Sequence, residues 1–149
     1  MNTLLTIEKR NAVLTTMAAL LAQERTALKS SNQQDLANYS GEDLAMEKRL
    51  LVDDAKIDGM ILSLQQLASQ DDPVGKIRFE FVHDNGLKIY NKTAAFGTIL
   101  IIYESRPDVT VEAGGIAFKS GNKILLKGGK ESLLSNQKIV SLWQQALEN

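Results

Sequence analysis

The chain has 149 residues, of which 44% are hydrophobic and 23% charged, as is typical of a single soluble domain with its own core. Its 17 Lys and Arg residues nearly balance its 18 Asp and Glu residues, and the net charge of -1 excludes the basic field that would attract nucleic acid or an anionic membrane. The absence of Cys excludes disulfides, thiolate zinc sites and a cysteine nucleophile on this chain, and the single His excludes a multi-histidine metal site.

Residues 1–73 are expected to form an N-terminal helical segment. Apolar residues recur at helical spacing between Leu4 and Leu28, which predicts one long first helix. The polar residues 30–32 then provide a stop or a cap, and a shorter helix is expected over residues 43–51.

The clearest helical pattern comes near the end of this segment. Six apolar residues recur at spacings of three, four and seven, which predicts an amphipathic helix: Ile57, Met60, Ile61, Leu64, Leu67 and Ala68. Pro73 ends the helical segment, because proline disfavours helical backbone in the residue before it.

Residues 74–95 are expected to form a β-hairpin. Phe79 and Phe81 alternate with charged residues, which is strand spacing. Asn85-Gly86 is the dipeptide most favoured in a two-residue hairpin turn, because both central residues of that turn need positive φ.

Such a turn places Phe81 opposite Tyr90 and Phe79 opposite Lys92, on the same face as Ile77. Two strands alone are marginally stable in water, so this aromatic face must be covered. The cover could be the rest of the domain or another subunit, and the sequence alone does not choose between them.

From residue 96 to residue 149 the pattern becomes α/β. Two apolar runs predict strands buried on both faces, over Thr98–Tyr103 and Lys123–Lys127. Helices are expected after each of them, over Val109–Phe118 and Glu131–Leu147. Strands joined through helices are normally parallel with right-handed crossovers, so the two strands should share one sheet.

The turn after the second strand, Lys127-Gly128-Gly129-Lys130, is the first candidate site. A helix that begins just after a parallel strand presents unpaired N–H groups and a positive dipole end, which bind phosphate and ribose groups. The glycines would let a ligand approach the backbone and the lysines would add cations. The alternative is a tight turn with solvated lysines, and both common nucleotide-binding fingerprints are absent.

The second candidate site is Tyr103–Asp108, after the first strand. Carboxyl ends of parallel strands meet at one edge, so both clusters should face a single crevice. Arg106 suits a carboxylate or phosphate through its bidentate guanidinium. In the alternative interpretation Arg106 simply pairs with Glu104 or Asp108.

These motifs carry a family resemblance. The stretches Ile102–Thr110, Lys119–Asn122 and Lys127–Glu131, in that order, closely resemble the gamma-glutamyl phosphate reductases, also called glutamate-5-semialdehyde dehydrogenases, of the aldehyde dehydrogenase superfamily. Shorter stretches agree in the family's order, namely Arg49–Leu51, Asp72–Gly75 and Asn85–Leu87.

The resemblance implies an α/β fold with N-terminal helices, a hairpin that acts as an oligomerisation arm, and the first half of a parallel Rossmann-like sheet. It implies NADPH-dependent reduction of L-glutamyl 5-phosphate to glutamate 5-semialdehyde in proline biosynthesis. In the family a cysteine thiolate attacks the acyl phosphate, and the thioester accepts hydride from NADPH. This chain has no Cys, so it resembles the N-terminal part of a longer enzyme and should be inactive alone.

The resemblance also assigns roles to cofactor residues. Lys127 matches the superfamily lysine that binds the adenosine ribose. Lys130 falls where many NAD-using relatives carry Glu, and a cation there favours the 2′-phosphate of NADP(H). Ile102, Tyr103 and Ser105 match the segment that lines the cofactor cleft, and the loop glycines Gly128 and Gly129 complete the set.

Arg106 matches the Asn that donates to the developing oxyanion in aldehyde dehydrogenases, so it would bind the acyl phosphate or stabilise that oxyanion. Two stretches depart from the family pattern. Residues 93–97 lack its usual Val-Pro-Leu-Gly-like run, and Asp108 stands where Asn is common.

Partners and location follow from these observations. The resemblance implies a homo-oligomer formed through residues 74–95 and an association with glutamate 5-kinase. The longest aliphatic or aromatic run, Ile99–Tyr103, is far shorter than the ~20 residues of a membrane helix. Charged residues at positions 8–10 stand where a signal peptide would be apolar, so a cytoplasmic protein is expected.

Two other functions are alternatives to the reductase. One is a non-catalytic association module that binds a partner subunit through the hairpin. The other is a different acyl-phosphate or aldehyde dehydrogenase, which a different downstream substrate domain would distinguish.

Overall fold

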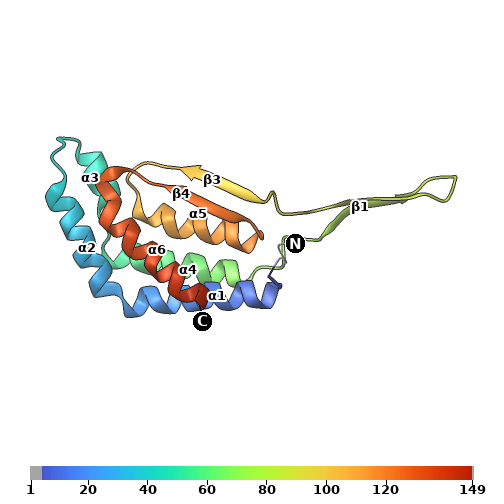
Figure 1. Ribbon diagram of the computed structural model, residues 1–149, viewed down its shortest axis with the longest axis horizontal. Helices are drawn as coiled ribbons and strands as arrows, with labels where there is room; N and C mark the ends of the chain where they lie inside the picture. Colours follow the sequence, from blue (N-terminus) through green and yellow to red (C-terminus); the bar gives the residue numbers. More distant parts are fainter. Residues whose placement is uncertain (1–4, 149) are drawn as a thin grey trace.

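The computed structural model describes residues 5–148 and consists of a helical body, a small sheet and a projecting arm (Figure 1). None of the helices in this range is long and apolar enough to cross a lipid bilayer. In chain order the elements are α1 (Ile7–Gln23), α2 (Arg25–Asn38), α3 (Leu44–Leu50), α4 (Asp54–Ser69), β1 (Ile77–Val82), β2 (Lys88–Lys92), β3 (Thr98–Ile102), α5 (Pro107–Lys119), β4 (Lys123–Lys127), the 3₁₀ turn η1 (Lys130–Ser132) and α6 (Leu133–Glu148).

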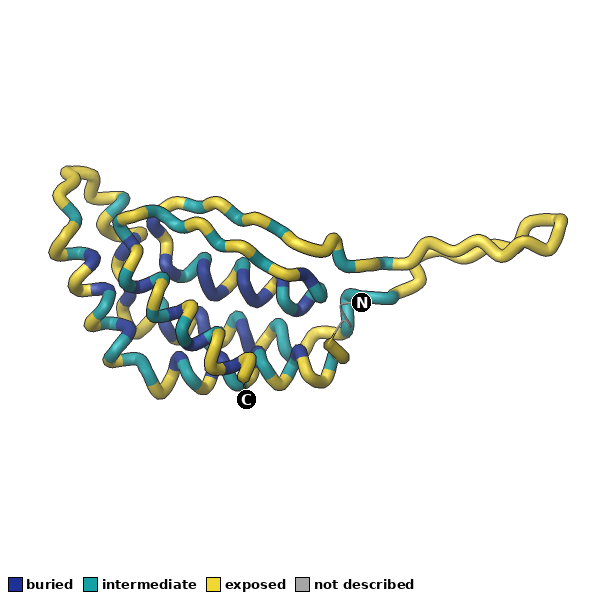
Figure 2. Tube along the Cα trace, viewed as in Figure 1, coloured by how far each residue is buried: buried dark blue, intermediate teal, exposed yellow. Residues whose placement is uncertain are grey.

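The core lies between α1, α4, α5 and α6 (Figure 2). The predicted amphipathic helix is confirmed as α4. Its N-terminus is capped by Asp53, which accepts a hydrogen bond from the N–H of Lys56 at 2.8 Å. Helices from both ends of the sequence contribute fully buried side chains to this one core, among them Leu14, Met17, Leu21, Ile57, Leu64, Val111, Ile139 and Leu142.

The expected single first helix is wrong. Leu4 lies outside the described residues, α1 begins at Ile7, and the helical path is interrupted at Glu24 before α2 continues through residues 30–32. Asn32 does not stop the helix, because its side chain is buried and bonded to other elements. Its Nδ2 donates to the Leu50 carbonyl oxygen at 2.8 Å, and its Oδ1 accepts from the Val52 N–H at 2.7 Å.

The strands β3 and β4 form a two-stranded parallel sheet, as predicted. The sheet lies over α5, and its inner face is partly buried there (Figure 1). The expectation that both faces are buried is wrong. No element in the described residues covers the outer face, where Leu100, Ile102 and Leu125 are 57%, 66% and 58% exposed.

The hairpin of β1 and β2 is confirmed, but its predicted register is wrong by one residue. Phe81 pairs with Ile89 and Glu80 pairs with Tyr90, so Tyr90 lies on the face opposite Phe79 and Phe81. A bulge between Ile77 and Phe79 shifts the pairing again at the root, where Ile77 pairs with Lys92.

The turn explains the shift in register. The N–H of Gly86 donates to the His83 carbonyl oxygen at 2.8 Å, and the N–H of His83 donates to the Leu87 carbonyl oxygen at 2.8 Å. Only Gly86 has positive φ in this turn, at +85°. The loop is therefore a three-residue turn that ends in a left-handed glycine rather than a two-residue turn with two such residues.

Candidate functional site

The candidate site lies where β3 and β4 end side by side. Ile102 pairs with Lys127 in parallel register. Just beyond them, the Tyr103 N–H donates to the Lys127 carbonyl oxygen at 3.1 Å. The two strands therefore end at the same edge of the sheet, as predicted, and residues 103–108 and 128–131, which follow them, form the rim of that edge.

Gly128 and Gly129 lie tightly against the segment that follows β3. A Cβ on Gly128 would lie 2.4 Å from Asn136 Nδ2 and 3.1 Å from the Tyr103 hydroxyl, and a Cβ on Gly129 would lie 2.2 Å from Ser105 Oγ. Side chains at these positions would overlap with neighbouring atoms. The packing of the two loops therefore explains why both positions are glycine, with no need to invoke a ligand.

A chain of hydrogen bonds joins the two loops to each other. The Tyr103 hydroxyl is 2.7 Å from Thr110 Oγ1, and Thr110 Oγ1 donates to Asn136 Oδ1 at 2.8 Å. Asn136 Nδ2 donates to Ser132 Oγ at 2.9 Å, which donates to the Gly129 carbonyl oxygen at 3.2 Å. Burial raises the pKa of Tyr103, although its hydrogen bond with Thr110 acts in the opposite direction.

A second link crosses the rim between Ser105 and Glu131. The buried hydroxyl of Ser105 donates to Glu131 Oε2 at 2.6 Å. That hydrogen bond lowers the pKa of Glu131, because it stabilises the carboxylate form. The rim therefore carries a fixed negative charge between the two loops.

The N-terminus of α6 is not open as the sequence predicts. The chain passes through η1 before α6 begins at Leu133, and the first N–H groups of the helix are occupied. Asp35, from α2, accepts hydrogen bonds from the N–H of Leu134 at 3.0 Å and of Ser135 at 2.8 Å. A phosphate at these two N–H groups would have to displace a carboxylate that is 4% exposed.

Arg106 precedes α5 and is about half exposed. Its Nη2 lies 3.3 Å from Asp108 Oδ2, which is the pairing that the alternative interpretation predicts. Glu104 pairs instead with Arg49 at 3.0 Å. The long, single contact with Asp108 leaves most of the Arg106 guanidinium able to bind an anion.

The prediction that both clusters face a single crevice is wrong, because six of the candidate residues divide among three surfaces. Tyr103, Gly128 and Gly129 line a groove of about 360 Å³ that continues along α6 past Gln137 and Gln144.

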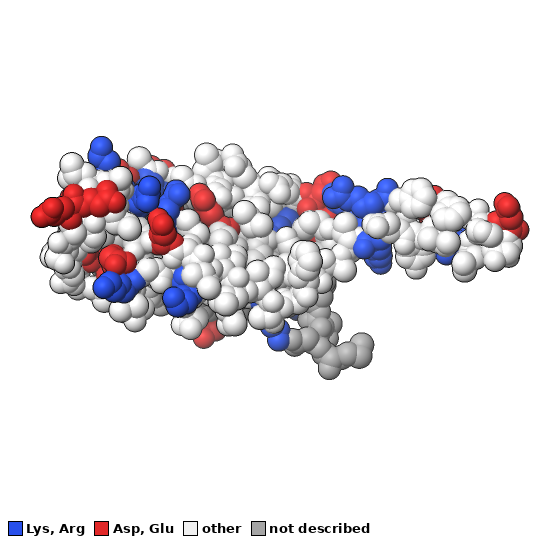
Figure 3. Space-filling view, turned by 90° about the horizontal axis from the view of Figure 1, so that it is seen from above, with Lys and Arg blue, Asp and Glu red and all other residues white. Residues whose placement is uncertain are grey.

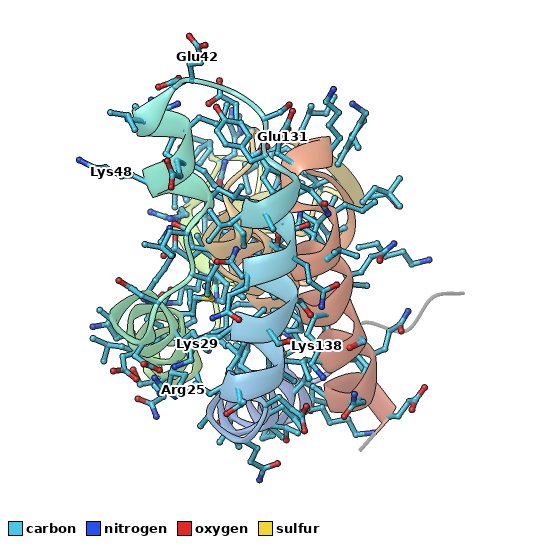
Figure 4. The ribbon with its side chains drawn as sticks, turned by 90° about the vertical axis from the view of Figure 1, so that its left-hand side faces the viewer. Arg25, Lys29, Glu42, Lys48, Glu131 and Lys138 are labelled. Atoms are coloured by element: carbon cyan, nitrogen blue, oxygen red, sulfur yellow. The ribbon has the colours of Figure 1, made fainter. Side chains whose placement is uncertain are left out.

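Lys130 and Glu131 line a second groove of about 590 Å³ beside the end of α2, with Tyr39 and Ser40 on its other side. Figure 4 shows Glu131 at the start of α6, beside the upper end of α2.

Ile102 and Lys127 lie on the outer face of the sheet, which is largely uncharged around its middle (Figure 3). Lys127 and Lys130 form no ion pair with any described side chain, so both ammonium groups are available to an anion. Within residues 5–148, no three His, Asp or Glu side chains form a group able to hold a metal ion.

Asp35, Thr110 and Asn136 shape the site but were not predicted as site residues. Asp35 lies 100 positions before Ser135 in the sequence, and no local pattern connects them. Thr110 carries a sequence signal, because it is a polar residue between Val109 and Val111, whereas Asn136 lies among polar residues and does not stand out.

Comparisons with known proteins identify relatives. The gamma-glutamyl phosphate reductase of Persephonella marina is 39% identical over 143 residues, which are 95% of this chain and 32% of the relative. The enzyme of the same name from Aquifex aeolicus is 40% identical over 139 residues, 92% of this chain and 32% of the relative. The chain therefore spans about a third of the length of these relatives. No protein-family model matches it.

Solved structures give the same result. The Thermotoga maritima gamma-glutamyl phosphate reductase superposes with a TM-score of 0.90 at 38% identity, covering 97% of this chain and 35% of that one. An NAD-dependent benzaldehyde dehydrogenase from Corynebacterium glutamicum shares the fold, with a TM-score of 0.75 at 14% identity over 95% of this chain and 29% of that one. The predicted aldehyde dehydrogenase-type α/β fold is thus confirmed, and over about a third of its length gamma-glutamyl phosphate reductase is homologous to this chain.

Proposed function

We propose that the chain is the N-terminal, cofactor-binding part of a cytoplasmic, NADPH-dependent reductase that converts L-glutamyl 5-phosphate to L-glutamate 5-semialdehyde in proline biosynthesis. The observation that carries this proposal is the superposition on the Thermotoga maritima enzyme, at a TM-score of 0.90 and 38% identity over 97% of the chain.

Lys127 and Lys130 are the residues best suited to hold the adenosine ribose of the cofactor and its 2′-phosphate. Both are exposed, and neither is paired with an acidic side chain in the described part of the chain. NADPH supplies a hydride when it is bound. The occupied N-terminus of α6 means that lysine ammonium groups, rather than the N–H groups of Leu134 and Ser135, must provide most of the positive potential.

Arg106 is the residue proposed to bind the substrate. It lies on the same rim as Ser105 and faces solvent, with one contact at 3.3 Å to Asp108. Its charge suits the acyl phosphate or the oxyanion that develops during reduction. The thiol nucleophile must come from another part of the enzyme, because this chain has no Cys.

The test is a segment exchange. The homologous third of the Thermotoga maritima reductase is replaced by this chain, and NADPH oxidation with L-glutamyl 5-phosphate is measured. We expect turnover by the folded chimera and none by the 149-residue chain alone. A chimera with the circular dichroism of the parent enzyme but no NADPH-dependent turnover would contradict the proposal, and so would activity of the chain alone.

An association role is favoured by one specific observation. Every residue of β1 and β2 is exposed, including Phe79 at 57% and Tyr90 at 59%. Apolar side chains are thus exposed on both faces of the hairpin, Phe79 on one and Tyr90 on the other, and monomeric proteins rarely leave large apolar patches uncovered. We propose that this hairpin joins copies of the chain into a homo-oligomer, which sedimentation over a range of concentrations would test. A mass that stays monomeric at every concentration would contradict it.

A further inference from the structure

The hairpin β1–β2 projects from the body as an arm (Figure 1). Its strands pair with each other, and every one of their residues is exposed (Figure 2). Packing of the strands against the body therefore does not fix the direction of the arm. Its direction must be set at its root, in residues 70–76 and 93–97.

The outgoing leg of the arm is held by Asp72. Its Oδ2 accepts from Arg10 Nη2 at 2.7 Å, and its Oδ1 accepts from the Val74 N–H at 2.9 Å. Burial alone would raise the pKa of Asp72, but the hydrogen bonds from Val74 and Arg10 outweigh it and the pKa is lowered. The carboxylate thus joins α1 to the first residues of the arm.

The Arg10 guanidinium is an unusual group to find inside a protein, since its residue is only 2% exposed. Its Nη1 donates to the carbonyl oxygen of Lys119, the last residue of α5, and its Nε donates to the Leu5 carbonyl oxygen at 3.1 Å. Because Arg10 contacts both Asp72 and α5, it transmits the position of α5 to the root of the arm.

Lys119 is the second buried cation, also 2% exposed. Its Nζ donates to Asn11 Oδ1 at 2.7 Å, to the Gln70 carbonyl oxygen at 2.7 Å and to the Ala68 carbonyl oxygen at 3.3 Å. It therefore caps the C-terminal carbonyls of α4, from which the chain leaves toward the arm. Burial lowers the pKa of Lys119, and the nearby charge of Arg10 lowers it further.

The return leg of the arm, residues 93–97, is held near the C-terminal end of α5. Thr93 Oγ1 donates to the Pro73 carbonyl oxygen at 2.7 Å and so ties the two legs together. Four residues later, the Gly97 N–H donates to Asn122 Oδ1 at 3.1 Å, and Asn122 lies three residues after the end of α5. Both legs of the arm are thus bonded to residues around the C-terminal end of α5.

We infer that Arg10, Asp72 and Lys119 form a polar clamp that fixes the direction of the arm. The N-terminal part of α1 and the C-terminal ends of α4 and α5 meet at this clamp. Each of the three residues forms hydrogen bonds to at least two elements or loops. Non-polar side chains of similar size would fill the same space but would not specify which carbonyls and which carboxylate face each other. Arg10, Asp72 and Lys119 are therefore positioning residues for the arm.

The experiment measures arm direction through spin labels. Because the chain has no Cys, a variant with Asp84→Cys in the arm's turn and Ala19→Cys on α1 has two unique sites for spin labels. Pulsed electron-paramagnetic resonance then gives their distance distribution, with excess unlabelled chain present to suppress distances between copies. The clamp is broken by Lys119→Met, which keeps an unbranched apolar stem of similar length but removes the ammonium group, and separately by Asp72→Ala.

Two variants serve as matched controls. Lys76→Met removes the exposed Lys76–Asp71 ion pair, 3.2 Å long, which lies at the same root but outside the clamp. Ile139→Val lowers stability from within the core and leaves the clamp intact. If the clamp acted only through the overall stability of the fold, Ile139→Val would broaden the distance distribution as much as the clamp variants do.

We expect the width of the distance distribution to increase at least about twofold in Lys119→Met and in Asp72→Ala, and to stay unchanged in both controls. Should Lys119→Met fail to fold, the result for Asp72→Ala decides, because the Asp72 side chain is 31% exposed and water can take its place beside Arg10. A distribution as narrow as that of the parent chain in the folded clamp variants would overturn the inference, and so would equal broadening in Ile139→Val. The measurement does not depend on cofactor binding, so it can fail while the proposed reductase function stands.

Discussion

Asp35 on α2 and Ser135 on α6 are joined by two hydrogen bonds across 100 positions of sequence. The carboxylate accepts the Ser135 N–H at 2.8 Å and the Ser135 hydroxyl at 2.6 Å. We predict that Asp35→Ala lowers the free energy of unfolding by about 2–4 kcal/mol, because it removes a buried cap and leaves its donors unpaired. Urea denaturation of the two proteins measures this difference.

Glu42→Ala is the control for that prediction, since Glu42 is an exposed carboxylate near the same end of the molecule (Figure 4). We expect it to change the stability by less than about 0.5 kcal/mol. An Asp35→Ala protein as stable as the Glu42→Ala protein would show that the cap contributes little.

The rim carboxylate of Glu131 provides a prediction about pH. Its pKa is lowered from the ordinary value of 4.5, chiefly by the Ser105 hydroxyl. A lowered pKa in the folded state contributes stability that is complete above the unfolded pKa and is lost as pH falls through the folded one. We predict that Ser105→Ala raises the pKa of Glu131 and removes part of this acid-dependent stability. NMR titration of the Glu131 carboxyl carbon reports the shift, and an unchanged titration midpoint would contradict the assignment.

Gly129 provides a steric prediction. A Cβ at this position would lie 2.2 Å from Ser105 Oγ and 2.9 Å from Glu131 Oε2. Gly129→Ala should therefore separate the two loops and cost about 1–3 kcal/mol of stability. The double variant Ser105→Gly/Gly129→Ala frees that space, and we expect it to recover part of the loss in thermal denaturation. A double variant that loses at least as much stability as the two single variants together would argue against this clash.

Lys130 provides a prediction about cofactor choice. In the chimeric reductase, Lys130→Glu places an anion where the proposed function needs a cation for the 2′-phosphate. We expect the ratio of kcat/KM for NADPH to that for NADH to fall by at least about tenfold, equivalent to about 1.4 kcal/mol. Lys138→Glu is the control, because Lys138 lies on α6 and pairs with Glu24 at 2.8 Å (Figure 4). An unchanged ratio in the Lys130 variant would reject the charge argument.

Local sequence patterns predicted the elements whose stability is local or periodic. The α4 stripe was correctly identified because one helix face is buried along its whole length, with Ile57 and Leu64 fully buried. The parallel pairing of β3 and β4 followed from the helix between them. The shared rim at Tyr103 and Gly128 then followed from topology alone.

The errors arose where distant contacts outweigh local preference. Asn32 suggested a helix stop, but its amide bonds to Leu50 and Ser135 from within a helix. The hairpin register depended on whether the turn has two or three residues, and Asn85-Gly86 is compatible with both. Burial of β3 was overestimated because the sequence of a strand does not show what covers each face.

The bare outer face of the β3–β4 sheet has a consequence for the protein in concentrated solution. Strands with unpaired edges and apolar side chains recruit further strands, which leads to aggregation. Leu100, Ile102 and Leu125 form such a surface, and Lys123 and Lys127 are the cations that interrupt it. Charged side chains beside an exposed apolar strand oppose such recruitment, so we expect Lys123 and Lys127 to slow aggregation, in addition to the proposed role of Lys127 toward the cofactor.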